Sequence, residues 1–77
     1  MRVKVYAPPF AKREKLDKNS FLELQEGATL KEVFEILEIP FPRGLVNLCK
    51  VNYEKADLKM TLREGDVISF YVYLAGG

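Results

Sequence analysis

The chain has 77 residues, of which 48% are hydrophobic and 30% are charged, and 12 lysines and arginines nearly balance 11 aspartates and glutamates. This length suits one domain with a thin core, and a net charge of +1 provides no general field for binding nucleic acid or an acidic membrane. Histidine is absent and Cys49 is the single cysteine, which excludes an internal disulfide, a Cys/His zinc site and a histidine-based catalytic couple.

The first quarter of the chain predicts a strand, a charged loop and a second strand. Residues 2–7 (RVKVYA) alternate charged and β-branched side chains, which places Val3 and Val5 on one face. The Pro-Pro pair that follows ends the strand, because neither proline can donate a ladder hydrogen bond. Residues 11–20 are a charged loop with one helical turn, and residues 21–24 (FLEL) form the second strand.

A helix is the clearest local prediction. Thr29 is placed to cap its first turn, with Glu32 three residues later reaching back to the N–H of the cap in a capping box. Pro40 is expected to end the helix. Its apolar positions follow helical spacing and predict a buried stripe of Leu30, Val33, Phe34 and Leu37.

Residues 45–53 (LVNLCKVNY) alternate again and predict a third strand. Cys49, as a small buried hydrophobe, shares the inward face with Val51 and Tyr53. A connector follows, with a short strand at residues 58–60.

Glu64-Gly65-Asp66 has the composition of a tight turn that leads into the final strand, residues 67–73. Side chains on this strand alternate, with Ile68, Phe70 and Val72 pointing inward and Ser69, Tyr71 and Tyr73 pointing outward.

These elements predict an α+β fold in one domain spanning residues 1–77. Its mixed sheet has four to five strands, one main helix crosses one face, and the last strand lies near the centre. Residues 74–77 leave this platform as a flexible tail. The start of the chain lacks the apolar core of a signal peptide, and no apolar run has the length of a membrane span, so a cytoplasmic protein is expected.

The sequence closes on YVYLAGG, whose two glycines suit one kind of chemistry. A terminal carboxyl group has a pKa of roughly 3.3–3.7 and is an unreactive anion near neutral pH, so a partner has to activate it with ATP. Gly76 and Gly77 lack a Cβ and can be threaded into a narrow active-site slot. The alternative is an ordinary frayed end. No paired base and nucleophile is evident, which favours a carrier over an enzyme.

The chain resembles the ubiquitin-like β-grasp sulfur carriers of the MoaD/ThiS type. The resemblance covers the whole chain and rests on VKVYA followed by FAKRE, on EGATLKEVFEIL, on CKVNYE and on LREGDVISFYVYLAGG. The last stretch is the most specific, because a Gly-Asp-Val turn and a hydrophobic strand precede a closing Gly-Gly.

This resemblance implies that a ubiquitin-activating-enzyme-like adenylyltransferase adenylates Gly77, and that a sulfur donor protein then supplies the sulfur of a thiocarboxylate. Gly76 and Ala75 would thread the tail into the partner. ATP is used by the activating enzyme, and the chain itself is expected to bind neither a cofactor nor a metal. The acceptor is the large subunit of molybdopterin synthase or the thiazole synthase of thiamine synthesis, with no nucleic-acid or membrane partner.

Three residues before the diglycine are predicted to contact partner proteins. Leu74 stands where the tail leaves the domain, and Tyr71 and Tyr73 combine apolar area with a hydrogen-bonding tip. The alternative for the two tyrosines is an ordinary half-buried position on a strand.

Two segments point to different pathways. YAPPFAKREKLD resembles the molybdopterin type, which makes the small subunit of molybdopterin synthase the leading hypothesis. YLAGG lacks the prolines common before the diglycine in that group and is nearer the thiamine-type ending. Outside sulfur chemistry, the alternatives are a β-grasp interaction module and a protein modifier joined through Gly77 to lysines.

Overall fold

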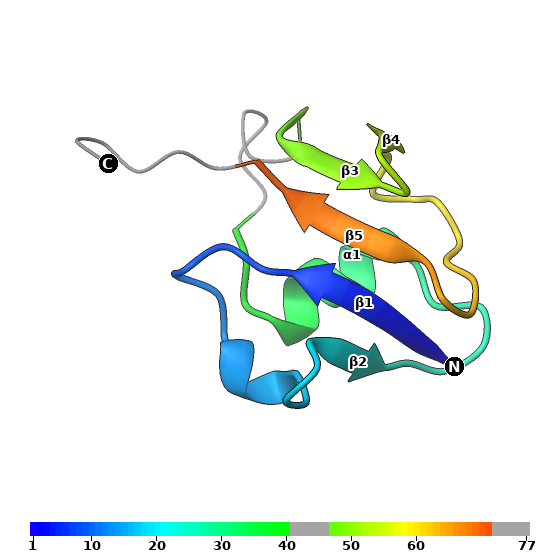
Figure 1. Cartoon of the computed structure of the whole chain (residues 1–77). Helices are drawn as coiled ribbons and strands as arrows, with labels where there is room; N and C mark the ends of the chain where they lie inside the picture. Colours follow the sequence, from blue (N-terminus) through cyan, green and yellow to red (C-terminus); the bar gives the residue numbers. More distant parts are fainter. Residues whose placement is uncertain (41–46, 72–77) are drawn as a thin grey trace.

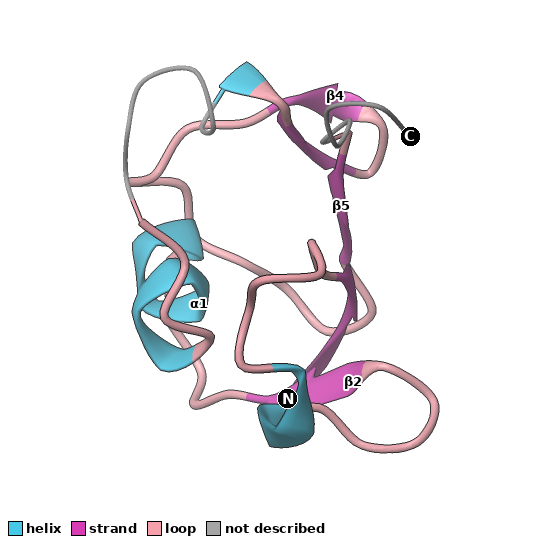
Figure 2. Cartoon of the chain, turned by 90° about the vertical axis from the view of Figure 1, so that its left-hand side faces the viewer, coloured by secondary structure: helices cyan, strands magenta, loops and turns pink. Residues whose placement is uncertain are grey.

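The structure is a computed structural model that describes residues 1–40 and 47–71. The described residues form two layers, a five-stranded sheet and the helix α1, which lies against one of its faces (Figures 1 and 2). The elements are β1 (Arg2–Tyr6), a 3₁₀ turn (Arg13–Lys15), β2 (Phe21–Glu23), α1 (Leu30–Ile36), β3 (Cys49–Val51), β4 (Glu54–Lys55) and β5 (Val67–Phe70). The predicted α+β class, the mixed sheet and the single main helix are confirmed, and the arrangement is consistent with a β-grasp.

The strand order β2-β1-β5-β3-β4 places β5 at the centre of the sheet, as predicted. β1 and β5 run parallel, with Val5 opposite Ile68, and the other neighbouring pairs are antiparallel. A parallel pair needs a long crossover connection, and the chain between β1 and β5 supplies one that contains α1. The start of β5 is fixed by the predicted turn, in which Gly65 has a φ of 83° and Asp66 N–H donates to the Arg63 carbonyl at 3.1 Å.

The core lies between the sheet and α1. Val3 and Val5 are fully buried, as the alternation in the first strand predicts. The predicted stripe of α1 is buried in full (Leu30, Val33, Phe34, Leu37). Across the layers, the rings of Phe34 and Phe70 lie 5.3 Å apart at 57°. Each fully buried aliphatic or aromatic side chain contributes about 1.5–3 kcal/mol, so the packing of α1 on the sheet is a substantial part of the apolar stabilisation.

The predicted capping box does not form at the start of α1. Thr29 occupies the N-cap position without a side-chain hydrogen bond to the helix. Backbone carbonyls from the segment before β5 accept hydrogen bonds from the first N–H groups of the helix instead. Leu30 N–H donates to the Met60 carbonyl at 3.1 Å, and Lys31 N–H donates to the Leu58 carbonyl at 2.9 Å. The capping prediction is therefore wrong, since a tertiary contact satisfies the donors that a capping side chain would otherwise satisfy.

The end of α1 also differs from the prediction that Pro40 stops it. The helix ends at Ile36, and Glu38 adopts a left-handed conformation with a φ of 53°. Ile39 N–H then donates to the Phe34 carbonyl at 2.8 Å, and Glu38 N–H donates to the Glu35 carbonyl at 3.1 Å. These two bonds form a Schellman motif with glutamate where glycine is usual, so the helix has ended before the proline is reached.

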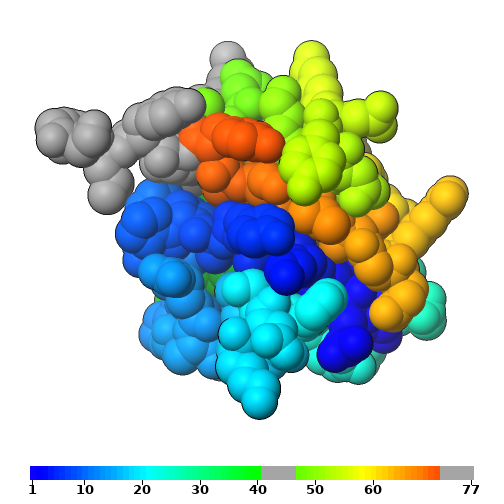
Figure 3. Space-filling view, viewed as in Figure 1, coloured from blue at the N-terminus to red at the C-terminus, as the bar shows by residue number. Residues whose placement is uncertain are grey.

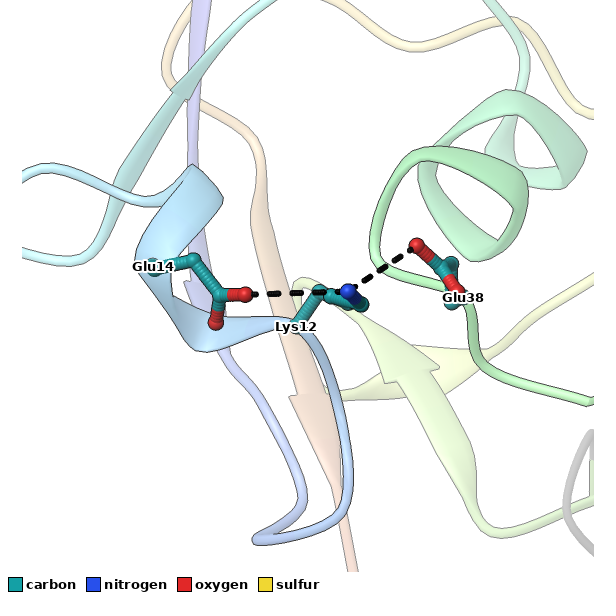
Figure 4. Close-up of polar contacts among 3 residues, drawn as sticks. All are labelled: Lys12, Glu14 and Glu38. Carbon is teal, nitrogen blue, oxygen red and sulfur yellow. Dashed lines mark ion pairs between the residues drawn. The ribbon is translucent and has the colours of Figure 1, made fainter.

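Lys12 ties the loop after β1 to this end of the helix. Its N–H donates to the Leu37 carbonyl at 2.8 Å, and its Nζ lies 3.6 Å from the Glu38 carboxylate and 4.0 Å from that of Glu14 (Figure 4). Exposed ion pairs contribute little, so the backbone hydrogen bond is the firmer link.

The third predicted strand is shorter than expected and turns back as a hairpin. Asn52 and Tyr53 have φ values of 52° and 67° between β3 and β4, which is the geometry of a two-residue type I′ turn. Tyr53 is 70% exposed and does not share the face of Cys49, so that prediction is wrong. The strand predicted at residues 58–60 is also wrong, because Leu58 and Lys59 form a turn and the additional strand is β4.

The Asn52 side chain explains why the chain turns at this position. Its Nδ2 donates to Asp66 Oδ1 at 2.9 Å, and its Oδ1 accepts the Val67 N–H at 2.9 Å. Asparagine tolerates the left-handed region better than other residues that carry a side chain, and these bonds hold the hairpin against the start of β5.

Replacing Tyr53 with glycine is expected to stabilise the protein. A left-handed conformation costs a residue with a Cβ roughly 1–2 kcal/mol, and the exposed Tyr53 ring offsets little of that cost by burial. Tyr53→Gly completes an Asn-Gly type I′ turn and should raise the melting temperature by about 4–8 °C in a domain of this size. Thermal unfolding followed by circular dichroism measures the change.

The matched control is Glu54→Gly, one residue later on β4, where no positive φ is present. Glycine in a strand weakens it, so this variant is expected to melt below the parent protein. A fall in melting temperature for Tyr53→Gly as well would show that the tyrosine side chain stabilises the hairpin more than its backbone strain destabilises it.

Candidate functional site

The described part of the final strand ends just before the tail. Tyr71 N–H donates to the Leu48 carbonyl at 2.9 Å, one residue beyond the pairing of Phe70 with Cys49. The predicted site residues beyond it lie outside the described residues (Tyr73, Leu74, Ala75, Gly76, Gly77). The structure thus defines the platform up to Tyr71, and the roles assigned to the tail stay predictions.

Three exposed apolar side chains lie at the end of the sheet where β5 finishes. Because β1 and β5 are parallel, Tyr6 and Tyr71 follow their strands to the same end, and Leu48 lies there because β3 runs the opposite way. Tyr6 is 51% exposed, Leu48 38% and Tyr71 43%. We call these three residues the tail-end cluster. Exposed tyrosines of this kind are typical of protein interfaces.

Tyr71 is exposed as the sequence predicts, and its contact with a partner stays a prediction. Sequence reasoning missed Tyr6 and Leu48. The signal for Tyr6 was available, since it alternates with the buried Val5 and therefore points away from the core. The same signal was available for Leu48, which directly precedes the inward-facing Cys49 in the predicted strand, but its place beside Tyr71 follows only from the pairing of β3 with β5.

The face of the sheet opposite α1 is rich in cations and aromatic rings. Figure 3 shows this face, with β1 in blue beside β5 in orange. Arg2 Cζ lies 4.7 Å from the centre of the Phe21 ring. Lys4 Nζ lies 5.4 Å from the same ring and 5.5 Å from that of Tyr6. The cationic groups thus lie over aromatic faces, where the ring quadrupole attracts them.

Cys49 faces the core and offers no reactive thiol. It is buried on β3, as predicted, and desolvation raises the pKa of its thiol to about 12, against a smaller opposing effect of the neighbouring Lys50 charge. Since the thiolate is the nucleophilic form, this side chain is inert near neutral pH.

Two kinds of feature are absent from the described residues. Within residues 1–40 and 47–71, no group of three or more histidine, cysteine, aspartate or glutamate side chains is arranged to hold a metal ion. In the same part of the chain, no helix has the length and apolar character needed to cross a membrane.

The model of the ThiS family matches residues 3–77, which is nearly the whole chain and includes the diglycine. No curated protein and no solved structure gives a match. Members of this family are sulfur-carrier proteins rather than catalysts themselves, and they act with activating enzymes and synthases. The chain belongs to the ThiS family of ubiquitin-like sulfur-carrier proteins.

Proposed function

We propose that the chain carries sulfur as a thiocarboxylate on Gly77 and serves as the small subunit of molybdopterin synthase. The family match through Gly77 carries the sulfur-carrier part of the proposal, and the FAKRE loop after β1 favours the molybdopterin acceptor. The exposed tail-end cluster supports it, because a partner that grips the tail can rest on Tyr6, Leu48 and Tyr71. In this role Leu74, Tyr73 and Tyr71 contact the partner.

The chemistry begins with a poor electrophile. The Gly77 carboxylate attacks the α-phosphate of ATP in the activating enzyme, which releases pyrophosphate and leaves an acyl-adenylate. The outer sulfur of a donor persulfide then attacks the acyl carbon and displaces AMP, which leaves the chain joined to the donor through an acyl disulfide. A second thiol cleaves the S–S bond, so the terminus is released as a thiocarboxylate and the two thiols are left as a disulfide. The chain contributes the carboxyl group and a slender tail, in which Ala75 and Gly76 fit a narrow slot because they carry little or no side chain.

A second acceptor is favoured by one observation. The ending YLAGG lacks the prolines that precede the diglycine in carriers of the molybdopterin type. This ending favours transfer of the same thiocarboxylate sulfur to the thiazole synthase of thiamine synthesis. The FAKRE loop after β1 favours the molybdopterin assignment. The experiment therefore offers the thiocarboxylated chain to both acceptors.

The test uses the full chain with an adenylyltransferase of the activating-enzyme type, ATP, a persulfide-bearing sulfur donor and a thiol reductant that cleaves the acyl disulfide. Intact-mass spectrometry should show a product heavier by the exchange of one oxygen for sulfur, and only when ATP is present. The thiocarboxylated protein is then offered separately to the large subunit of molybdopterin synthase and to thiazole synthase, each with its precursor. An unchanged mass contradicts the carrier proposal, and sulfur transfer only to thiazole synthase replaces the first acceptor with the second.

A further inference from the structure

The strand register collects positive charge on the face of the sheet opposite α1. Lys4 lies between Phe21 and Val67 in one row, and Lys50 lies between Ser69 and Lys55 in the next. Arg2 lies on the same face opposite Glu23. The strand positions of this outer face therefore carry four cations and one carboxylate. We call the four cations the basic rows (Arg2, Lys4, Lys50, Lys55).

This charge is concentrated on one face of the protein. The whole chain has a net charge of only +1, and the exposed side of α1 and its end carry Lys31 together with three glutamates, Glu32, Glu35 and Glu38. The protein is thus positive on the outer face of the sheet and negative on the helix side. A charge distribution of this kind orients an approaching charged partner.

None of the basic rows forms an ion pair within 4.0 Å in the described part of the chain, although Arg2 lies opposite Glu23 and, after the Phe21 N–H hydrogen bond, the Arg2 charge also lowers the pKa of Asp17. The ion pairs found there join Lys12 to Glu14 and Glu38, away from this face. Arg2 and Lys4 lie instead over the rings of Phe21 and Tyr6, at 4.7–5.5 Å. An aromatic ring positions a cation without cancelling its charge, so these groups stay available to carboxylates of another molecule.

The basic rows adjoin the tail-end cluster. Tyr6 and Ser69 lie in the same row as Lys50, and Tyr71 follows β5 two residues after Ser69. Ser69 is small and 7% exposed, so the larger residues on either side of it form the surface that a partner meets. Apolar contact and positive charge therefore belong to one continuous face.

We propose that this face binds an acidic surface on the activating enzyme that holds the tail, and the identity of this partner rests on the proposed function. The tail-end cluster supplies the apolar area, and the basic rows pair with carboxylates of the enzyme. Electrostatic attraction of this kind raises the association rate and fixes the register of docking, and salt weakens it. A protein surface fits better than nucleic acid, because rings and cations alternate across the sheet and the overall charge is near zero.

The test measures binding of the full chain to the adenylyltransferase by surface plasmon resonance at low and high salt. Lys4→Glu and Lys50→Glu are each expected to slow association at low salt by about tenfold or more. They should also reduce the dependence of binding on salt. Lys4→Gln, which removes the charge without reversing it, should have an intermediate effect.

Lys31→Glu is the matched control, since it makes the same change in charge on the exposed side of α1. It is expected to leave association unchanged, and melting temperatures check that every variant is folded. Equal weakening by Lys31→Glu, or wild-type binding that does not vary with salt, overturns the proposal. Lys4-dependent binding to single-stranded RNA or to anionic lipid vesicles, in the absence of such binding to the enzyme, overturns it as well.

The outcomes for docking and for sulfur transfer are separable. Docking is also measured with a chain that lacks Gly77, which cannot form the normal thiocarboxylate but retains the whole outer face. A salt-dependent, Lys4-dependent association of this shortened chain supports the docking face even if the mass of the full chain never changes. A mass shift that proceeds at the wild-type rate in Lys4→Glu and Lys50→Glu supports the carrier function and overturns the docking face.

Discussion

Removal of Gly77 is expected to reduce sulfur transfer by at least about a hundredfold. The shortened chain ends at Gly76, and its carboxylate falls short of the reacting position by up to one residue, roughly 3.5 Å. A misplacement of about 1 Å is enough to lower a rate by about a hundredfold. The initial rate of sulfur transfer to the acceptor synthase measures the effect, and intact mass shows whether the shortened terminus still acquires sulfur.

Two variants separate tail length from tail width. One added glycine after Gly77 moves the carboxylate in the opposite direction and is expected to be as defective as the deletion. Gly76→Ala keeps the length but adds a Cβ in the proposed slot, so it should slow adenylation while leaving the carboxylate in reach. The free energy of unfolding of each variant should stay within about 0.5 kcal/mol of that of the parent protein. Wild-type transfer by the shortened chain would show that Gly77 is not the reactive residue.

The fate of Gly77 also distinguishes a sulfur carrier from a protein modifier. A modifier leaves branched remnants on lysines of other proteins after digestion, and trypsin, which cleaves this chain last at Arg63, leaves residues 64–77 as the branch. A carrier instead releases its sulfur and returns with a free carboxylate. Peptide mapping of a cell lysate that contains the activated chain reveals which outcome occurs. Abundant branched remnants, together with no thiocarboxylate, would favour the modifier alternative.

Burial patterns that repeat locally were predictable from the sequence. Val3 and Val5 alternate with charged residues, so their burial follows from the period of a strand. Leu30, Val33 and Phe34 follow the period of a helix and are fully buried. In both elements the neighbours of a residue along the chain decide which face it occupies, and no long-range information is needed.

Features that depend on distant partners were not predictable in the same way. Asn52 reverses the chain because its side chain bonds to Asp66 and Val67, about fifteen residues away. Likewise, the donors at the start of α1 reach carbonyls of Leu58 and Met60. Local propensity favoured a longer third strand and a side-chain cap, and tertiary hydrogen bonds overrode both.

In the candidate site, too, one feature follows from the local sequence and the others depend on distant strand pairing. The outward direction of Tyr71 follows from alternation along the last strand, and the exposed side chain agrees with it. The grouping of Tyr71 with Tyr6 and Leu48 follows only from the parallel pairing of β1 with β5 and the antiparallel pairing of β3 with β5. The basic rows arise in the same way, because β1, β3 and β4 each contribute cations from separate parts of the sequence.

Phe34→Ala is expected to be the most destabilising single substitution in the core. Phe34 has no exposed surface, and its ring lies 5.3 Å from that of Phe70 across the two layers. Truncating a buried phenylalanine to alanine costs about 3–5 kcal/mol, whereas a domain of this length has a total stability of roughly 4–12 kcal/mol. The melting temperature should fall by more than about 10 °C, as measured by circular dichroism, with urea unfolding to give the free energy.

Ile36→Ala is the matched control on the same helix, because Ile36 is 36% exposed whereas Phe34 is fully buried. It should cost less than half as much as Phe34→Ala, while Phe34→Leu, which retains most of the side-chain volume, should lie between the two. Phe70 is the last residue of β5 before Tyr71, so loss of the Phe34 ring also loosens the strand that positions the tail. Sulfur transfer by Phe34→Ala should therefore fall at temperatures where most of the protein is still folded, and Ile36→Ala should transfer normally. Equal loss of stability in both variants would mean that the two rings do not couple α1 to the central strand.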